Sequence, residues 1–153
     1  MERIHMIIEW YNRATKNEYK QYEKNVELNH FFVTLDKEFN PKQAWRTSFF
    51  NPKTKKMLSF SCDTGEKLVE DDVADPNSIE PLPLQNYLEW DHVKGLLSDL
   101  PEHGDGFAML TSINGTVYWS LSFILKNLKI LHVRVNALTG EREDKVHEFA
   151  MPQ

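Results

Sequence analysis

Residues 103–106 carry side chains that could do chemistry, because His103 and Asp105 place an imidazole and a carboxylate among two glycines. Such a loop could bind a metal ion or a phosphate, or could serve a hydrolase. A metal site or an active site would need further groups, such as another histidine, to converge on this loop. We therefore predict no catalytic residue, no metal ligand and no cofactor site, and we keep His103 and Asp105 as candidates for partner binding.

The triplet Asp63-Thr64-Gly65 is the one that presents the catalytic carboxylate in aspartic proteases. Those enzymes pair two such loops, whereas the matching position in the second half of this chain is Leu138, and the charged Glu66 follows the glycine. A strand turn in which the aspartate caps and the glycine accepts a positive φ explains the triplet better. The neighbouring Cys62 is interpreted as a small buried hydrophobe.

Two histidines, His132 and His147, lie on adjacent predicted strands, where they could face each other. Cross-strand histidine pairs pack or titrate more often than they bind a metal, so we interpret this pair as a packing pair. The acidic run from Glu70 to Asp75 is interpreted as part of a linker rather than as a cation site. The sequence contains no phosphate-binding glycine loop, zinc-helix motif or serine elbow.

The composition limits the classes of protein to which this chain can belong. It has 153 residues, 41% of them hydrophobic, and a net charge of -5, which repels phosphate backbones and argues against a nucleic-acid partner. Its single cysteine permits no intrachain disulfide and fits the reducing cytosol. No segment approaches about 18 uninterrupted apolar residues, and Glu2 and Arg3 are not typical of a secretory leader. We expect a cytoplasmic protein without a membrane span.

Hydrophobic periodicity predicts the order of the elements. Apolar residues spaced by three or four predict helices over 3–25 and 84–100. Alternation and strand propensity predict strands over 30–36, 44–50, 57–62, 66–70, 106–112, 116–124, 128–136 and 141–149. Asn114-Gly115 is the strongest hairpin signal, because both residues tolerate a positive φ. In the strand after this turn, alternation places Trp119 on the core face and Tyr118 on the opposite face with serines.

The two halves of the chain share landmarks at a nearly constant offset. Trp45 and Trp119 are 74 residues apart, and Gly65 and Gly140, in matching Thr-Gly turns, are 75 residues apart. This offset predicts an α+β fold of two helix-plus-antiparallel-sheet repeats, each α-β-β-β-β, which can form one compact unit. The predicted boundaries are 1–75 for the first repeat, 76–83 for an acidic and proline-rich linker, and 84–153 for the second repeat.

Residues 133–141, Val-Arg-Val-Asn-Ala-Leu-Thr-Gly-Glu, resemble the closing strand and turn of PepSY-type domains. Residues 58–66 are a poorer copy. The resemblance implies tandem units, each a helix packed on an antiparallel sheet, similar in shape to cystatin-like folds. It also implies a binding or inhibitory module and carries over no catalytic residue. Members of this family are usually extracytoplasmic or membrane-tethered, which differs from the cytoplasmic location expected above.

We expect a non-enzymatic binding or inhibitory module that recognises a protein segment or a small ligand. Exposed aromatic side chains are the best contact candidates, since aromatic anchors concentrate binding energy. The candidate partner-binding residues are Trp10, Trp90, Tyr118, His103 and Asp105. One alternative is an acidic immunity or decoy protein that blocks a basic partner, and another is a hydrolase or metal-dependent enzyme built on the His103 and Asp105 loop. The sequence leaves the partner's identity and the oligomeric state open.

Overall fold

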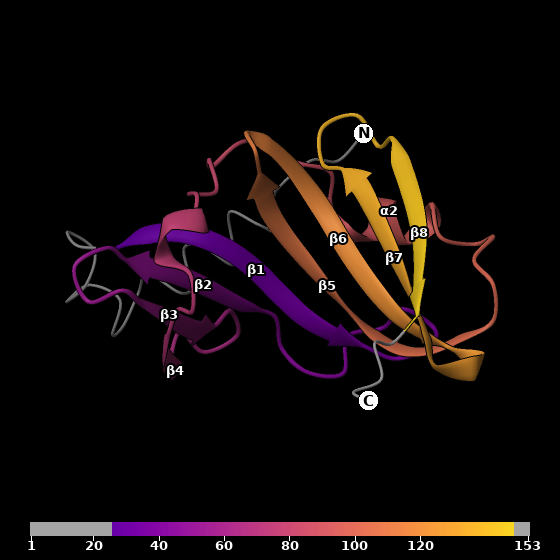
Figure 1. Ribbon diagram of the computed structural model, residues 1–153, viewed down its shortest axis with the longest axis horizontal. Coiled ribbons are helices and arrows are strands. Elements are labelled where there is room, and N and C mark those ends of the chain that lie inside the picture. The colour runs from indigo at the N-terminus through magenta and orange to yellow at the C-terminus, as the bar shows by residue number, and fades with distance from the viewer. Residues whose placement is uncertain (1–25, 149–153) are drawn as a thin grey trace.

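The computed structural model describes residues 26–148, which form one antiparallel sheet of eight strands (Figure 1). The strands are β1 (Glu27–Leu35), β2 (Arg46–Asn51), β3 (Lys56–Ser61), β4 (Lys67–Asp72), β5 (His103–Ile113), β6 (Thr116–Leu125), β7 (Lys129–Asn136) and β8 (Arg142–Glu148). Their order across the sheet is β4-β3-β2-β1-β5-β6-β7-β8. Two four-stranded meanders therefore meet through their first strands, β1 and β5, which are paired antiparallel.

The predicted α+β fold of two helix-plus-sheet repeats is wrong. Within residues 26–148 one continuous sheet carries a single α-helix, α2 (Trp90–Gly95), and two short 3-10 helices, η2 (Pro76–Ser78) and η3 (Lys126–Leu128). The helix predicted over 84–100 is reduced to the six residues of α2. Before it, the Leu88 amide donates to the Ala137 carbonyl at 2.8 Å, so long-range pairing replaces helical hydrogen bonds there. The helix predicted over 3–25 lies outside the described residues.

The strands themselves were predicted closely, because turn residues separate them in the sequence. Asn114 and Gly115 have φ angles of 51° and 83° and connect β5 to β6, as the hairpin signal predicted. The two Thr-Gly turns also close in the same way, since each threonine Oγ1 accepts the amide N–H of the following glutamate at 3.2 Å. This likeness of the turns is local and does not extend to a repeated helix-plus-sheet unit.

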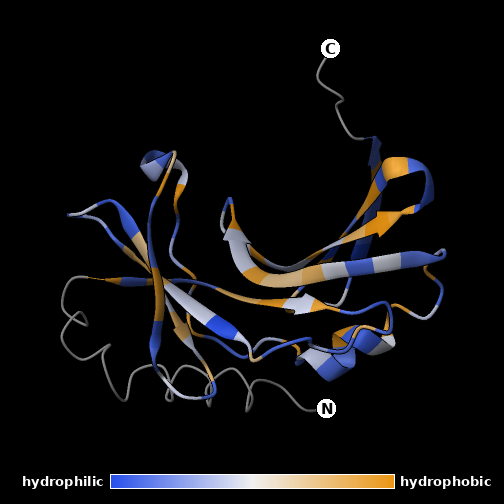
Figure 2. Cartoon of the chain, turned by 90° about the horizontal axis from the view of Figure 1, so that it is seen from below, coloured by the Kyte–Doolittle hydropathy of each residue, from blue (hydrophilic) through white to orange (hydrophobic). Residues whose placement is uncertain are grey.

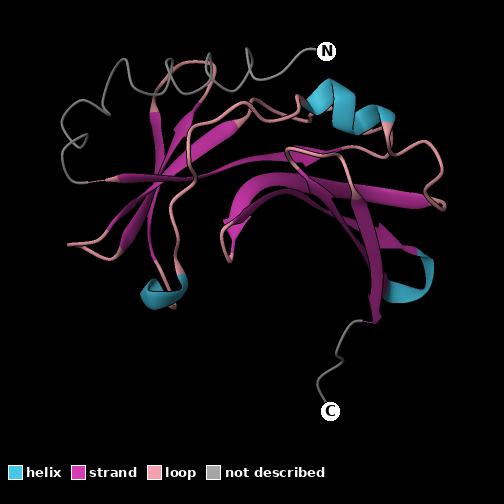
Figure 3. Cartoon of the chain, turned by 90° about the horizontal axis from the view of Figure 1, so that it is seen from above, coloured by secondary structure: helices cyan, strands magenta, loops and turns pink. Residues whose placement is uncertain are grey.

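One face of the sheet is apolar and covered. Alternation along the strands directs a continuous set of apolar side chains to this face. In the second meander they are Ala108, Leu110, Val117, Trp119, Leu121, Phe123, Leu131, Val133 and Val135, none more than 7% exposed. Figure 3 shows α2 on the outside of the arc formed by β5 and β6, so the helix and the chain around it cover this face. The buried side chains of α2, Trp90 and Val93, belong to the same core cluster.

Three tryptophans form the centre of this core. The rings of Trp45, Trp90 and Trp119 contact one another with centroids 5.7 to 5.9 Å apart. The Trp119 indole N–H donates to the Leu88 carbonyl at 2.8 Å, whereas the buried Trp90 indole N–H has no partner among the described residues. The cluster therefore joins the residue before β2, strand β6 and the first residue of α2.

The segment that leads toward α2 crosses the seam between the two meanders and is fastened to both sides of it. On the β1 side, the Leu82 amide donates to the Leu28 carbonyl at 2.8 Å, and Asn29 Nδ2 donates to the Glu80 carbonyl at 3.1 Å. On the β5–β6 side, the Glu80 carboxylate accepts hydrogen bonds from Ser112 Oγ and from the amides of the turn at 114–115. These bonds hold the Glu80 pKa below its ordinary value, the Gly115 amide contributing most.

The two outer strands of the sheet, β4 and β8, are rich in charge. All residues of β8 after Arg142 are exposed, and Figure 2 shows this strand as predominantly hydrophilic. β4 ends in Glu70, Asp71 and Asp72, which are exposed. Charged side chains on an edge strand disfavour pairing with a strand of another molecule, because like charges would be brought together.

Candidate ligand-binding face

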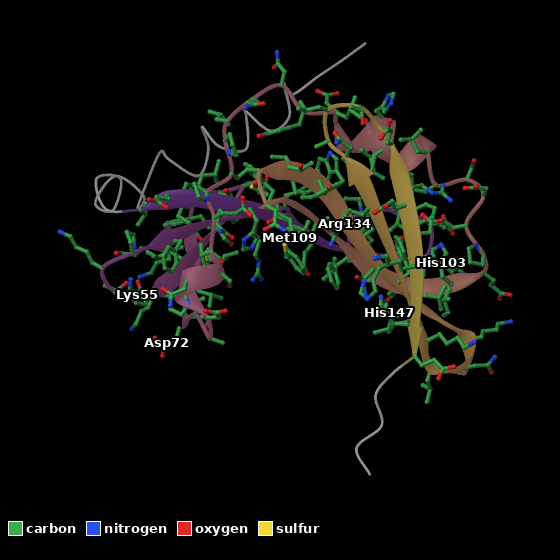
Figure 4. The ribbon with its side chains drawn as sticks, turned by 45° about the horizontal axis from the view of Figure 1, so that its top comes forward. Lys55, Asp72, His103, Met109, Arg134 and His147 are labelled. Carbon is green, nitrogen blue, oxygen red and sulfur yellow. The ribbon has the colours of Figure 1, made fainter. Side chains whose placement is uncertain are left out.

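The face of β5–β8 opposite α2 is concave and exposed, and we call it the open face (Figure 3). It receives the residues that alternate with the core positions, and these are mostly polar. Figure 4 labels three residues of this face, Met109 on β5, Arg134 on β7 and His147 on β8. Because β5–β8 curve toward this side, its side chains surround two neighbouring hollows.

The first hollow has a volume of about 330 Å³, and we call it the polar hollow. The open-face side chains that line it are Ser120, Ser122, His132, Arg134, Glu143, Lys145 and His147. The strand register places these side chains in rows across the sheet. Ser122, His132 and Lys145 are directly opposite one another in one row, and Ser120, Arg134 and Glu143 form the next row. Hydroxyl, imidazole and cationic groups therefore share one concave surface.

Two contacts organise the polar hollow. Ser122 Oγ lies 2.7 Å from His132 Nδ1, a hydrogen-bond distance. The rings of His132 and His147 meet edge to face with centroids 4.9 Å apart, which confirms that these two histidines face each other. Ser120 Oγ is buried and has no hydrogen-bond partner among the described residues. A buried polar atom without a partner is uncommon and marks a place where a bound group can supply one.

The electrostatics of the polar hollow favour negative charge. Arg134 and Lys145 are two cations against the single carboxylate of Glu143. Burial lowers the pKa of His132, and the positive charges of His147 and Arg134 lower it further. Burial first, and then its cationic neighbours, therefore favour the neutral form of the His132 imidazole. An anion placed among these groups would reverse that effect.

The second hollow, of about 390 Å³, adjoins the first and shares Ser122 with it. We call it the apolar hollow, because Phe107, Ile124 and Ile130 contribute most of its open-face side chains. Ile124 is 54% exposed, which is unusual for so large an apolar side chain. Lys42 and Asp105 stand at the rim and neutralise each other in an ion pair of 2.8 Å.

Guanidinium groups lie over aromatic rings on the same face of the sheet. Arg134 Cζ is 5.0 Å from the centre of the Tyr118 ring, and Arg46 Cζ is 5.8 Å from that of Phe32. Such stacking fixes the plane of a guanidinium while leaving its N–H donors free to bind an anion. Next to this area, burial lowers the pKa of His30 to about 4, and the positive charge of Arg46 adds to the effect.

The residues predicted for partner binding have different positions in the structure. Trp10 lies outside the described residues. Trp90 is only 3% exposed and belongs to the tryptophan cluster, so the expectation that it is exposed is wrong. Tyr118 lies on the open face beneath Arg134, and Asp105 lies at the rim of the apolar hollow.

The predicted His103 and Asp105 loop is the beginning of strand β5, and it does not bring its two functional groups together. His103 Nδ1 lies 2.8 Å from the Gly104 carbonyl, and its ring packs on Phe39 and Phe123. Asp105 instead pairs with Lys42. Within residues 26–148, moreover, histidine, cysteine and acidic side chains form no group of three or more that could hold a metal ion.

Sequence reasoning missed most of the polar hollow, above all Ser122, Arg134 and Lys145. The signal that could have found them is strand alternation, which already placed Tyr118 and its neighbouring serines away from the core. Alternation alone did not indicate which residues of β6 and β7 lie opposite each other. Their connection, η3, uses positive φ angles at Asn127 and Leu128, and leucine is not a residue from which such a turn is expected.

Comparison of the chain with protein-family models, curated proteins and solved structures gives no match. The resemblance to PepSY-type domains therefore stays a prediction. No helix in the described part of the chain is both long and apolar enough to cross a membrane. Function is accordingly inferred from the open face itself.

Proposed function

We propose that this protein is a non-enzymatic binding module that holds a protein segment or a small ligand on its open face. The observation that carries this proposal is the difference between the two faces of the second meander. One face is covered by α2 and the chain around it, whereas the other is concave and lined by hydroxyl, imidazole, cationic and apolar groups. Concave surfaces of a few hundred Å³ with a few convergent polar groups are typical of ligand sites.

The alternative of a hydrolase deserves a test because Ser122 and His132 are in hydrogen-bond contact. A serine nucleophile needs a base that is itself oriented by a third group, usually a carboxylate. In the described part of the chain His132 bonds to Ser122 and contacts His147, and no hydrogen bond to a carboxylate orients its ring. This arrangement supports binding over catalysis.

The alternative of an acidic decoy would be supported by negative charge gathered on one face. The acidic residues of β4 are consecutive, so they alternate between the two faces of the sheet. β8 mixes Glu143 and Asp144 with Lys145. The charge pattern within residues 26–148 therefore favours the open face over an acidic surface as the place where a partner binds.

The test is an NMR titration of the ¹⁵N-labelled protein with a panel of short peptides and small molecules of either charge. Ligands are expected to shift amide signals of β5–β8, and the Arg134→Gln variant is expected to reduce these shifts. Lys53→Gln, an exposed lysine on the β2–β3 turn, is the matched control. Shifts confined to α2 would contradict the proposal. Ester hydrolysis that disappears in Ser122→Ala would establish the hydrolase instead.

A further inference from the structure

The two hollows of the open face differ in chemistry and lie side by side. Ser122 lines both of them. On one side of this residue lie Arg134 and Lys145, and on the other lie Ile124 and Ile130. A ligand that occupies both hollows must therefore have a polar end and an apolar end.

We propose that the open face binds an amphipathic organic anion, a carboxylate or a phosphate monoester that carries an unbranched apolar chain. Its acidic head lies in the polar hollow near Arg134 and Lys145, and its chain lies over Phe107, Ile124 and Ile130 in the apolar hollow. This inference rests on the proposed function and names the ligand class for the same site. The carboxylate and the phosphate share the chemistry that the site recognises, and separate probes distinguish them.

Charge determines which head group fits. Arg134 is held in place over Tyr118, so its fork of N–H donors is already oriented for an oxyanion. Lys145 stands in the adjacent row, and only Glu143 opposes the two cations. Ser120 carries the unpartnered hydroxyl described above and can donate to the same oxyanion after rotation about its χ1 angle. A cationic head would meet Arg134 and Lys145 and is excluded.

The length of the site determines which chain fits. Along β6, Ser120 and Ile124 are four residues apart on the same face, which corresponds to about 13 Å at about 3.3 Å per residue. A chain of eight carbons, with C–C bonds of about 1.5 Å in zigzag, is about 9 Å long, and the acidic head group with its hydrogen bonds covers the remaining distance. Phe107, which contacts Phe32 with ring centroids 5.5 Å apart, gives the chain an aromatic wall.

Protonation adds a pH dependence to the head-group site. The groups that face His132 are Ser122, Arg134, Lys145 and His147, with Glu143 in the neighbouring row. A bound anion stabilises the protonated imidazole of His132 and so raises the pKa of this residue from its lowered value. Affinity is therefore expected to increase as the pH falls toward the lowered pKa of His132.

The experiment uses the full chain and isothermal titration with octanoate and octyl phosphate below their micellar concentrations. The controls are octylammonium for the sign of the charge, octanol for the charged head group, and acetate and inorganic phosphate for the apolar chain. Both octyl anions are expected to bind at least about tenfold more tightly than any control, and stronger binding of one of them identifies the natural head group. Octanesulfonate, which stays ionised, serves for the pH series.

Variants locate the two ends of the ligand. Arg134→Gln with Lys145→Gln is expected to weaken anion binding about tenfold to a hundredfold, since a hydrogen bond to a charged group is lost. Ile124→Ser is expected to weaken it several-fold by removing chain contacts. Leu68→Ser is the matched control, because this leucine is similarly exposed on the distant strand β4. All of these residues are on the surface, so the variants are expected to fold.

Equal binding of octylammonium and octanoate, or anion binding that survives the double variant, would overturn the assignment of this ligand class. Failure of every octyl probe, together with shifts of the open face by other members of the ligand panel, would refute the amphipathic anion and leave the binding module standing. Failure of both experiments would refute both proposals.

Discussion

The buried hydrogen bond of Trp119 permits a sharp test of how the chain is held against the sheet. Trp119→Phe removes the indole N–H that donates to the Leu88 carbonyl at 2.8 Å and leaves this carbonyl with one partner fewer in the core. Losing such a bond costs about 1 to 3 kcal/mol of unfolding free energy. The smaller ring adds about 1 kcal/mol from lost apolar contact. We expect a total loss of about 2 to 4 kcal/mol.

Trp90→Phe is the matched control in the same tryptophan cluster. Its indole N–H is buried without a partner in the described part of the chain, so the substitution loses ring contact but removes an unsatisfied donor. We expect Trp90→Phe to remain within about 1 kcal/mol of the wild type. Urea unfolding followed by far-UV circular dichroism measures both variants without relying on tryptophan fluorescence. Equal destabilisation of the two variants would refute the role assigned to the Trp119–Leu88 bond.

Two further predictions test other parts of the structure. Gly106→Ala would place a Cβ 2.1 Å from the Ser122 carbonyl oxygen, so we expect a loss of about 3 kcal/mol or more of unfolding free energy, or failure to fold. Gly104→Ala is the control. Its Cβ would lie 3.8 Å from the Ile124 carbonyl oxygen, so this variant should be tolerated. Thermal unfolding compares this pair, and equal midpoints would contradict the close approach of β5 and β6. Burial lowers the pKa of His30 to about 4. Between pH 6.5 and pH 4, therefore, the unfolded chain binds a proton at this histidine that the folded chain does not bind. The wild type should lose about 2 to 3 kcal/mol of unfolding free energy as the pH falls through that range. His30→Gln should show a flatter dependence in urea titrations at each pH, and an unchanged slope would show that His30 titrates normally.

The strands could be predicted from the sequence because their signals are local. Asn114-Gly115 marks its own hairpin, and alternation on either side of it identifies the core face around Trp119. The helix predicted over 84–100 failed because the backbone of Leu88 pairs with Ala137, a contact between residues far apart in the chain. Hydrophobic periodicity is a local signal and cannot reveal a hydrogen bond to a distant residue that competes with helix formation.

The candidate site was even less visible in the sequence. Trp90 was expected at the surface as an aromatic contact residue, yet it is buried in contact with Trp45 and Trp119. Arg134 and Ser120 are 14 positions apart in sequence and meet only through the register of β6 and β7. Sites built across strands depend on that register, which is decided by the connecting turn and by packing rather than by any motif.

The charged outer strands of the sheet limit how far it can grow. A further strand from a neighbouring molecule would have to lie along β8 or β4, where it would meet the exposed charges of Glu143 and Lys145 or of Asp71 and Asp72. Near neutral pH the fold thus carries its own barrier against filament formation. Acid would protonate the carboxylates, and high salt would screen them, so storage under either condition weakens that barrier.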